Sequence, residues 1–473
     1  MTAMTADAIL EASIAEIGAR LRSGDTTSEA LTVAALRRAQ SDSAHLNAFI
    51  RIRAEQAIAQ ARDLDREAAR GRWRGPLHGI PLAHKDCFER EGEAMSVGSQ
   101  VQMNLAARQT ARPLRLLNAA GAVDLGALNL SEMVAGPTGQ NPYFGDCRNA
   151  LDPDRISGGS SSGSGTAVAA RIVPGALGSD TGGSIRLPAA MQGIVGLKPT
   201  YGRVSRSGCF PRAFSLDCVG PMARSAQDCA LLLAAIAGHD PQDSTSLAAP
   251  VPDYVAQLDH QAAGSRVAAF ETGLTLAPPV RNAFDRLIAI ASSRFGSVAT
   301  TSFVDLPQCY ALGDLCAKAE AAAVHGAWMR TQPRSYSQAV YSRTEPGLHV
   351  PAVRYIEALS VRASMLRAFV QATLSAADVL ILPAMPGEVP TREDVDIESH
   401  GRVFNVVAQL TALTRPFSYL GLPVLSMPIG VDTNGLPVGV QLVGRPLSEA
   451  RLLAMAHALS GDLGPLIYPR KNS

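Results

Sequence analysis

Hydrophobic residues recur at helical spacing along the first part of the chain. They appear every three or four positions in AILEASIAEIGARL (residues 8–21) and in EALTVAALRRAQ (29–40), and residues 51–70 are rich in Ala, Gln, Arg and Glu. This spacing is typical of helices that bury one face against a core. We therefore predict a helical N-terminal part over residues 1–70.

The pattern changes at Gly75, after which short apolar segments alternate with clusters of Gly, Ser and Pro as far as about Gly220. GIPLAH, GAVDLGALN, RIVPGALGSD and GIVGLKPT are typical of short buried strands, and Ala-rich stretches between them are typical of helices. Further helices are expected at 225–238, 355–374 and 447–459, and strands at 378–385 and 439–444. This mixture predicts an α/β protein whose sheet is covered on both faces.

Composition narrows the class of protein. The 473 residues are 47% hydrophobic with a formal net charge of +1, which excludes a disordered chain and provides no field that would attract nucleic acid. The seven cysteines are odd in number and contain no C-x-x-C pair, which argues against a disulfide framework or a zinc site. The acidic N-terminus does not resemble a secretory signal, and the apolar run at 229–238 is too short to cross a bilayer. We expect a cytoplasmic protein without a membrane partner.

The most unusual segment is the run GGSSSGSG at Gly158–Gly165, which leads directly into TAVAA. Serine hydroxyls and free N–H groups gathered at a helix N-terminus favour developing negative charge. A flexible linker is disfavoured by these flanks, and the run fits neither a phosphate-binding loop nor a dinucleotide fingerprint. The five residues Gly159–Gly163 do fit a nucleophile elbow, which would make Ser161 the nucleophile of an α/β-hydrolase esterase with a downstream Asp and His.

Two more segments carry candidate chemistry. In GSDTGGSIRLP the adjacent Gly182 and Gly183 precede Ser184, and they allow backbone N–H groups to converge beside its hydroxyl, as an oxyanion hole requires, although an ordinary tight turn would give the same pattern. In GIPLAHKD an apolar strand delivers Lys85 towards the interior. Burial would lower the pKa of Lys85 and make it a general base, unless its amine reaches the surface from the strand end. A serine paired with such a lysine is a known alternative to Ser–His.

Taken together, LHGIPLAHKD, GGSSSGSGTAVAA and GSDTGGSIRLPA resemble the amidase signature family. GAVDLGALNLSEM, QNPYFGDCRNALDPDR, GIVGLKPTYGRVSRSG, TRPFSYLGLPVLSMPIG and NGLPVGVQLVGRP extend the resemblance in the family's order over essentially the whole chain. The resemblance implies the amidase signature fold, with a large mixed central sheet flanked by helices. It also implies a single domain over residues 1–473, with 75–220 as the catalytic core segment, and a reaction without a cofactor or metal.

The resemblance further assigns site residues. Ser184 corresponds to the serine that forms the acyl-enzyme, Ser160 to the bridging serine with a cis peptide bond, and Lys85 to the base. Thr181, Gly182 and Gly183 correspond to the oxyanion hole, and Gly136 and Arg362 are candidates for contact with the substrate. We therefore predict hydrolysis of a C–N bond in a small amide through a Ser-Ser-Lys triad.

The alternatives concern substrate and partners. Within the family the likeness is greatest to the A subunits of glutamyl-tRNA(Gln) amidotransferases and to related bacterial amidases, so a glutaminase that supplies ammonia to partner subunits is the main alternative. In those proteins an arginine at the place of Arg362 binds the glutamine carboxylate, but the acid that holds the α-amino group would fall near Thr411, where the sequence has no carboxylate. A non-catalytic scaffold is disfavoured by the intact triad. A homodimer is a further possibility.

Overall fold

The computed structural model describes residues 5–101, 106–395, 403–466 and 468. Within these residues, eleven strands form one sheet in the order β1-β3-β2-β4-β6-β5-β10-β11-β9-β7-β8. The strands are β1 (Phe49–Ile52), β2 (Pro81–Lys85), β3 (Val123–Leu128), β4 (Gly175–Asp180), β5 (Val195–Lys198), β6 (Cys218–Ala223), β7 (Val267–Phe270), β8 (Ala299–Thr301), β9 (Val379–Pro383), β10 (Val424–Val431) and β11 (Pro437–Gly444). Strands from the whole length of the chain therefore share one sheet.

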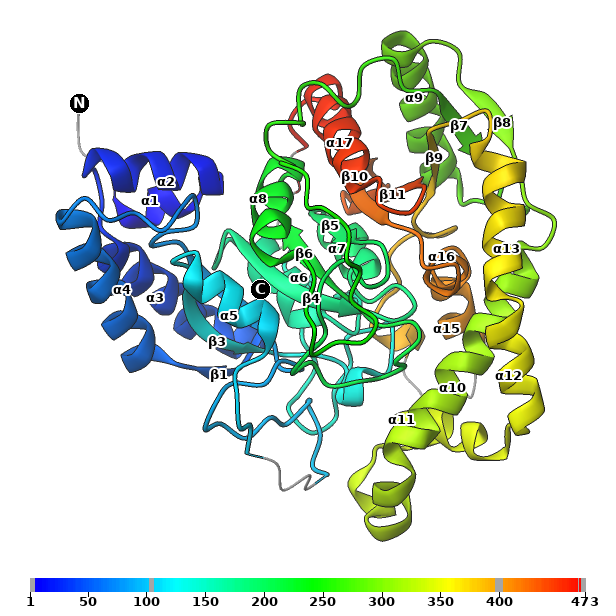
Figure 1. Cartoon of the computed structure of the whole chain (residues 1–473), viewed down its shortest axis with the longest axis horizontal. Coiled ribbons are helices and arrows are strands. Elements are labelled where there is room, and N and C mark those ends of the chain that lie inside the picture. The colour runs from blue at the N-terminus through cyan, green and yellow to red at the C-terminus, as the bar shows by residue number, and fades with distance from the viewer. Residues whose placement is uncertain (1–4, 102–105, 396–402, 467, 469–473) are drawn as a thin grey trace.

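Helices lie at both ends of this sheet and along it (Figure 1). Those of the N-terminal half are α1 (Ala6–Leu10), α2 (Ile14–Ser23), α3 (Ser28–Leu46), α4 (Ala54–Ala69), α5 (Arg112–Ala119), α6 (Ser162–Ala169), α7 (Arg186–Gln192) and α8 (Ala226–Ile236). Those of the C-terminal half are α9 (Pro278–Phe295), α10 (Leu306–Thr331), α11 (Gln338–Thr344), α12 (Ala352–Ser360), α13 (Arg362–Phe369), α15 (Val403–Thr411), α16 (Arg415–Tyr419) and α17 (Glu449–Leu463). In Figure 1, α1–α4 lie at one end of the molecule and α10–α13 at the other.

The sheet is mixed and covered on both faces, which confirms the predicted fold class. β2 runs parallel to β3 and β4, and β7 runs parallel to β8 and β9, whereas β10 is antiparallel to both of its neighbours. On β4, a Cβ at Gly175 would meet Leu232 of α8, whereas a Cβ at Gly178 would meet Ser161 and Ile185 beside α6 and α7. Residues three apart on a strand point to opposite faces, so α8 and the α6–α7 pair cover opposite sides.

The structure departs from the sequence prediction at several elements. The N-terminal part is not purely helical, because β1 interrupts it and pairs antiparallel with β3 at the edge of the sheet. The helix expected at 355–374 is two helices, α12 and α13, that meet at Val361. β6, β7, β8 and β10 lie outside the segments that the sequence predicts as strands. β1 and β8 are too short, at four and three residues, for a period of two to stand out from the flanking helices.

Sheet topology brings the candidate residues together. β2 and β4 are adjacent parallel strands, with His84 aligned to Leu177. Lys85 is the last residue of β2 and Asp180 the last of β4, and the carboxyl ends of adjacent parallel strands meet at the same edge of a sheet. The loop that leads into α6 lies over this edge, because a Cβ at Gly178 of β4 would meet Ser161.

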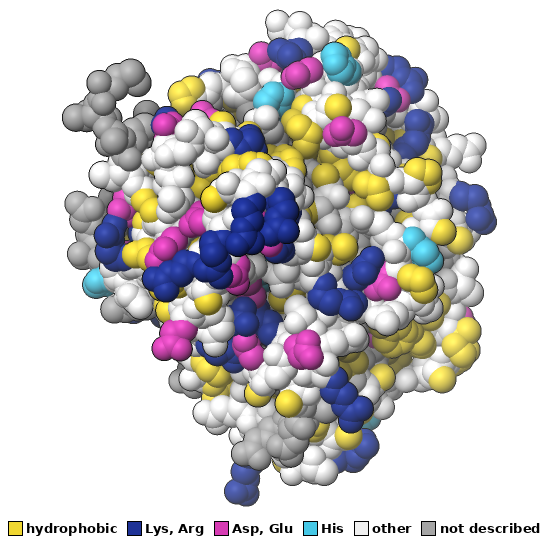
Figure 2. Space-filling view, turned by 60° about the vertical axis from the view of Figure 1, so that its left-hand side comes forward, with side chains coloured by type: hydrophobic (Ala, Val, Ile, Leu, Met, Phe, Trp, Pro, Cys, Tyr) yellow, Lys and Arg dark blue, Asp and Glu magenta, His cyan; other side chains and the backbone are white. Residues whose placement is uncertain are grey.

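The surface carries charges of both signs. On the face that Figure 2 presents, Lys and Arg side chains lie beside Asp and Glu side chains. Ion pairs such as Arg62–Glu29 and Arg74–Glu67 join residues of the N-terminal helices and the loop after α4. Within the described part of the chain, no helix is both long and apolar enough to span a membrane.

Candidate active site

Lys85 is fully buried at the end of β2, where its amine is surrounded by hydroxyl groups. Nζ lies 2.7 Å from Ser160 Oγ, 2.9 Å from Ser179 Oγ and 3.1 Å from Ser161 Oγ. Burial lowers the pKa of Lys85 below its usual range, because the charged ammonium loses its hydration. The hydroxyl groups satisfy the hydrogen bonds of the amine without a carboxylate that would hold the proton on it.

The hydrogen bonds of Ser161 indicate how a neutral Lys85 is oriented. Ser161 Oγ donates its proton to the carbonyl of Ser179 at 3.1 Å and accepts the Ser179 N–H at 3.3 Å, so towards Lys85 it acts only as an acceptor. A neutral amine has two N–H donors and one lone pair. When Ser161 and Ser179 accept the two donors, the lone pair of Lys85 faces Ser160, the nearest of the three hydroxyls.

The loop before α6 carries Ser160 in a cis peptide bond with Gly159. Gly159 is tightly enclosed, since a Cβ there would lie 2.6 Å from Ser131 Oγ and 2.7 Å from the Gly136 carbonyl. The Ser161 N–H donates to the Ser184 carbonyl at 3.2 Å, which joins this loop to the one after β4. Lys85, Ser160 and Ser184 are thus brought together from three separate segments of the chain.

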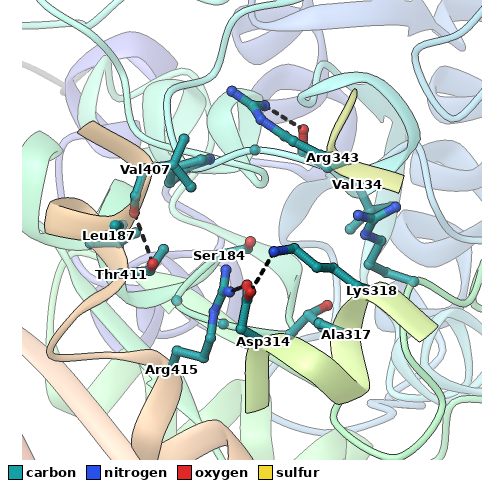
Figure 3. A pocket seen from close by; sticks show the side chains of 18 of the residues that line it. Val134, Ser184, Leu187, Asp314, Ala317, Lys318, Arg343, Val407, Thr411 and Arg415 are labelled. Carbon is teal, nitrogen blue, oxygen red and sulfur yellow. Dashed lines mark hydrogen bonds and ion pairs between the residues drawn. The ribbon is translucent and has the colours of Figure 1, made fainter. Parts of the chain in front are cut away.

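Ser184 lies in a cavity of about 280 Å³, whereas Lys85 and Ser160 lie behind it in the protein interior. It is 9% exposed, and Ser160 and Lys85 are 0% exposed. Within the described residues, the Ser184 hydroxyl has no hydrogen-bond partner. Figure 3 shows it in the middle of the cavity, with Arg415, Asp314 and Lys318 on one side and Arg343 on the other. Ser184 is therefore the member of the three that a ligand in the cavity can reach.

Asp180 and Arg186 shape the loop that carries Ser184. Both side chains are fully buried, and Arg186 donates to the Asp180 carboxylate through Nε at 3.0 Å and Nη2 at 2.9 Å. Asp180 also accepts the N–H groups of Gly183 at 2.7 Å and Ile185 at 3.1 Å. Burial by itself raises the pKa of Asp180, but the charge and hydrogen bonds of Arg186, together with the Lys198 charge and the Ile185 N–H, lower it to about 2, so the carboxylate stays ionised.

The predicted oxyanion hole is only partly free. The backbone of Thr181, Gly182 and Gly183 lines the cavity beside Ser184. The Gly183 N–H points to Asp180 instead of the cavity, which differs from the sequence prediction because the Asx-type turn of Asp180 takes this donor. The Thr181 hydroxyl donates to the carboxylate of Asp217, and this hydrogen bond fixes the Thr181 side chain.

The structure separates the two predicted substrate contacts. Gly136 lines the same cavity as Ser184. Arg362 is not among the described residues that line it. Its guanidinium donates to the Ser215 carbonyl at 2.6 Å and lies over the rings of Tyr201 and Tyr419. These contacts join the start of α13 to the loop of Ser215 and to α16 in this structure.

The nucleophile elbow is wrong as a description of this loop. Ser161 is fully buried and its hydroxyl is bonded to Lys85 and Ser179. The histidine nearest in sequence to Lys85 is His84, which accepts the Leu177 N–H, and burial lowers the pKa of His84 to about 4. Ser161 therefore has a lysine where the elbow would need a histidine.

Several charged residues of the cavity could not be recognised as site residues from the sequence. They are Arg212, Asp314, Lys318, Arg343 and Arg415. Lys318 lies 2.7 Å from Asp314, and Arg415 forms an ion pair with the same carboxylate. None of these residues belongs to a cluster of unusual composition, and in the sequence each looks like an ordinary exposed charge. Only the fold brings them together.

A mixed sheet, a buried lysine among serines and a reachable serine are features typical of serine hydrolases that use lysine in place of histidine. Comparison with known proteins gives the family. The Amidase family profile matches residues 30–453. The glutamyl-tRNA(Gln) amidotransferase A subunit of Thermosynechococcus vestitus is 35% identical over 470 residues, which cover 94% of this chain and 96% of that protein. The chain therefore belongs to the amidase signature family of hydrolases.

Two known structures are similar over nearly the whole chain. One comes from a vestigial protein complex that bears on the origins of an s-triazine catabolic enzyme; it is 34% identical with a TM-score of 0.90, covering 98% of this chain and 100% of that one. The other is the peptide amidase of Stenotrophomonas maltophilia, 30% identical with a TM-score of 0.80, covering 98% and 99%. Both likenesses extend the family assignment to the arrangement of the fold.

Proposed function

We propose that the protein hydrolyses the C–N bond of a small amide, with Ser184 as nucleophile, Ser160 as proton relay and Lys85 as base. The observation that carries this proposal is the Lys85 amine, buried among hydroxyls 2.7 Å from Ser160, directly behind the cavity that holds Ser184. A buried amine with a lowered pKa and no carboxylate partner is suited to accept a proton near neutral pH.

Each step of the reaction then has a group to perform it. Lys85 accepts the Ser160 proton, Ser160 accepts the Ser184 proton, and Ser184 Oγ attacks the amide carbonyl carbon. Backbone N–H groups of Thr181 and Gly182 stabilise the negative charge that develops on the carbonyl oxygen. When the C–N bond breaks, the proton returns through Ser160 to the leaving amine. Water, deprotonated by the same relay, then releases the acid and restores Ser184.

The cavity favours a small substrate. Its volume of about 280 Å³ lies just below the usual range for small-molecule pockets, which begins at about 300 Å³. Leu187, Val407 and the methyl-bearing Thr411 supply apolar surface on the part of the wall at the left of Figure 3. A primary amide with a short acyl chain fits these dimensions better than an extended peptide.

A glutaminase role is the second candidate, and the relatives are the observation that favours it. The amidotransferase A subunits from Thermosynechococcus vestitus and Anaeromyxobacter are 35% and 37% identical to this chain. Glutamine carries an α-ammonium that needs an acceptor. Of the described lining residues, Asp314 alone has a carboxylate, and Lys318 and Arg415 already neutralise it. The cavity therefore suits an amide without an α-amine better.

Matched substrates separate the two candidates. Glutaramate is glutamine without its α-amine, and pentanamide lacks both charged groups. We expect ammonia release from glutaramate or pentanamide with a kcat/KM at least about tenfold above that for glutamine, since an α-ammonium buried without a partner costs about 1–3 kcal/mol. Ser184→Ala protein is the control for contaminating amidases. A tenfold preference for glutamine would instead establish the glutaminase role, and co-purifying partner subunits would support it.

A further inference from the structure

Positive charge is in excess around the candidate active site. The described residues that line the cavity include four cationic side chains, Arg212, Lys318, Arg343 and Arg415, and one carboxylate, Asp314. Lys318 and Arg415 share this carboxylate. Arg212 and Arg343 form no ion pair with any carboxylate in the described part of the chain. Two guanidinium groups therefore border the cavity without an ion pair to a carboxylate of the described residues.

Arg343 reaches the cavity from α11 and lies against the Gly136 backbone, where an added Cβ would be 2.6 Å from Nη1. The same nitrogen donates to the Ala135 carbonyl at 3.0 Å. The acid that acts on Arg343 is Glu132, whose carboxylate accepts the Ser99 hydroxyl and the Ser337 N–H. Burial raises the pKa of Glu132 and lowers that of Arg343 to about 10. Glu132 is thus a weak counter-charge for Arg343.

Arg212 borders the cavity from the loop before β6 and is 8% exposed. Its Nη1 donates to Thr344 Oγ1 at 3.1 Å, which places it beside the end of α11. Burial, together with the charges of Arg343 and Arg415, lowers the pKa of Arg212 to about 10. Asp217 opposes this effect, but its carboxylate accepts backbone N–H groups, including that of Arg212 itself, and the Thr181 hydroxyl.

Buried guanidinium groups that repel one another are costly unless an anion joins them. Arginine presents a planar set of donors that matches a carboxylate. We propose that Arg343 and Arg212 form a carboxylate subsite, so that the preferred substrate is a small primary amide whose acyl chain ends in a carboxylate. This inference rests on the proposed function, because it takes the amide carbonyl to lie at Ser184.

The test compares glutaramate with pentanamide, which have the same chain length and differ in the terminal carboxylate. We expect kcat/KM to favour glutaramate by about 10- to 100-fold, the equivalent of one or two hydrogen bonds to a charged group. In Arg343→Met and Arg212→Met this ratio falls about tenfold or more, through a higher KM for glutaramate. Arg343→Lys keeps part of the ratio, because the charge remains.

Arg362→Met is the matched control. Arg362 is also a half-buried arginine that binds carbonyls, but it lies outside the described lining of the cavity. We expect Arg362→Met to keep the native ratio of kcat/KM for glutaramate to kcat/KM for pentanamide. A merely structural role for Arg343 would lower kcat/KM for both substrates equally and would overturn the inference. So would equal use of both substrates by the native protein.

Two measurements remain informative if a variant fails to fold or the enzyme proves inactive. Glutarate should inhibit pentanamide hydrolysis competitively in the native protein, and no inhibition would count against the subsite. Ser184→Ala should bind glutaramate in a calorimetric titration, and the double variant with Arg343→Met should bind at least about tenfold more weakly. Binding that depends on Arg343 without any turnover by the native protein would refute the proposed function while supporting the subsite.

Discussion

Replacing Lys85 with Met tests the proposed base most directly. Methionine is unbranched and similar in length, so it fills the space of the lysine stem while removing the amine. The variant loses the group that accepts the Ser160 proton, and its three hydroxyl partners lose a shared neighbour. We expect kcat to fall by at least about 10³-fold at neutral pH, because removal of one member of a proton relay disables the others.

The same substitution should also change how the unfolding free energy depends on pH. Burial lowers the pKa of Lys85 from its ordinary value of 10.5, so between the two pKa values the unfolded chain binds more protons than the folded protein. In that interval the stability contributed by Lys85 rises with pH, by up to about 1.4 kcal/mol per pH unit. The difference in unfolding free energy between the native protein and Lys85→Met should therefore shift in favour of the native protein as pH approaches 10.5.

Urea unfolding of both proteins at several pH values from neutrality to about pH 10 measures this difference. Lys198→Met is the matched control. Lys198 is also fully buried with a lowered pKa, but its amine donates to the Pro199 carbonyl and does not reach the serine cluster. It should show the same pH trend without the loss of activity of about 10³-fold. A stability difference for Lys85→Met that does not change with pH, or near-native turnover by that variant, would refute the assignment of Lys85 as a neutral base.

Three further predictions concern the nucleophile and two buried carboxyls. Ser184→Ala should abolish turnover and labelling by a fluorophosphonate, and residual labelling would point to another serine. Asp180→Asn breaks the fully buried ion pair with Arg186 and should cost about 3–5 kcal/mol of unfolding free energy. Asp462→Asn, which breaks an exposed ion pair, should cost less than about 1 kcal/mol. Equal costs would contradict a structural role for the buried pair. Burial raises the pKa of Asp228 to about 6, so the folded protein keeps this proton at pH values where the unfolded chain has lost it. The unfolding free energy should therefore fall by up to about 3 kcal/mol between about pH 4 and about pH 6. Asp228→Asn should remove that loss, which urea unfolding at several pH values measures.

The segments that hold the proposed chemistry stand out in the sequence as local patterns, and the family resemblance then assigns roles to Lys85, Ser160 and Ser184 within them. Lys85 ends an apolar strand, Ser160 follows two glycines, and Ser184 follows two more. A lysine at the end of a buried strand and serines in glycine-rich loops stand out from the statistics of ordinary surfaces and cores. Their mutual distances then follow from sheet topology, because β2 and β4 are parallel neighbours that end at the same edge.

The direction of backbone donors could not be predicted in the same way. Consecutive glycines permit an N–H to turn towards the cavity, but they do not require it. At Gly183 the decision depends on Asp180, whose carboxylate is fixed by Arg186 and competes for the donor. The sequence shows these residues as neighbours, whereas the competition among their hydrogen bonds depends on side-chain positions in the folded protein.

The charged wall of the cavity shows the same limit for side chains distant in sequence. Arg343 lies on α11 and Arg362 on α13, and both look like exposed charges in the sequence. What distinguishes them is where each guanidinium ends: over two tyrosine rings for Arg362, and on the cavity wall for Arg343. A charge becomes a candidate binding group only when the fold buries it without an opposite charge. Whether a charge is buried without an opposite charge depends on how Arg212, Arg343 and Asp314 lie around the cavity in the folded protein. The sequence around any one of them therefore does not show it.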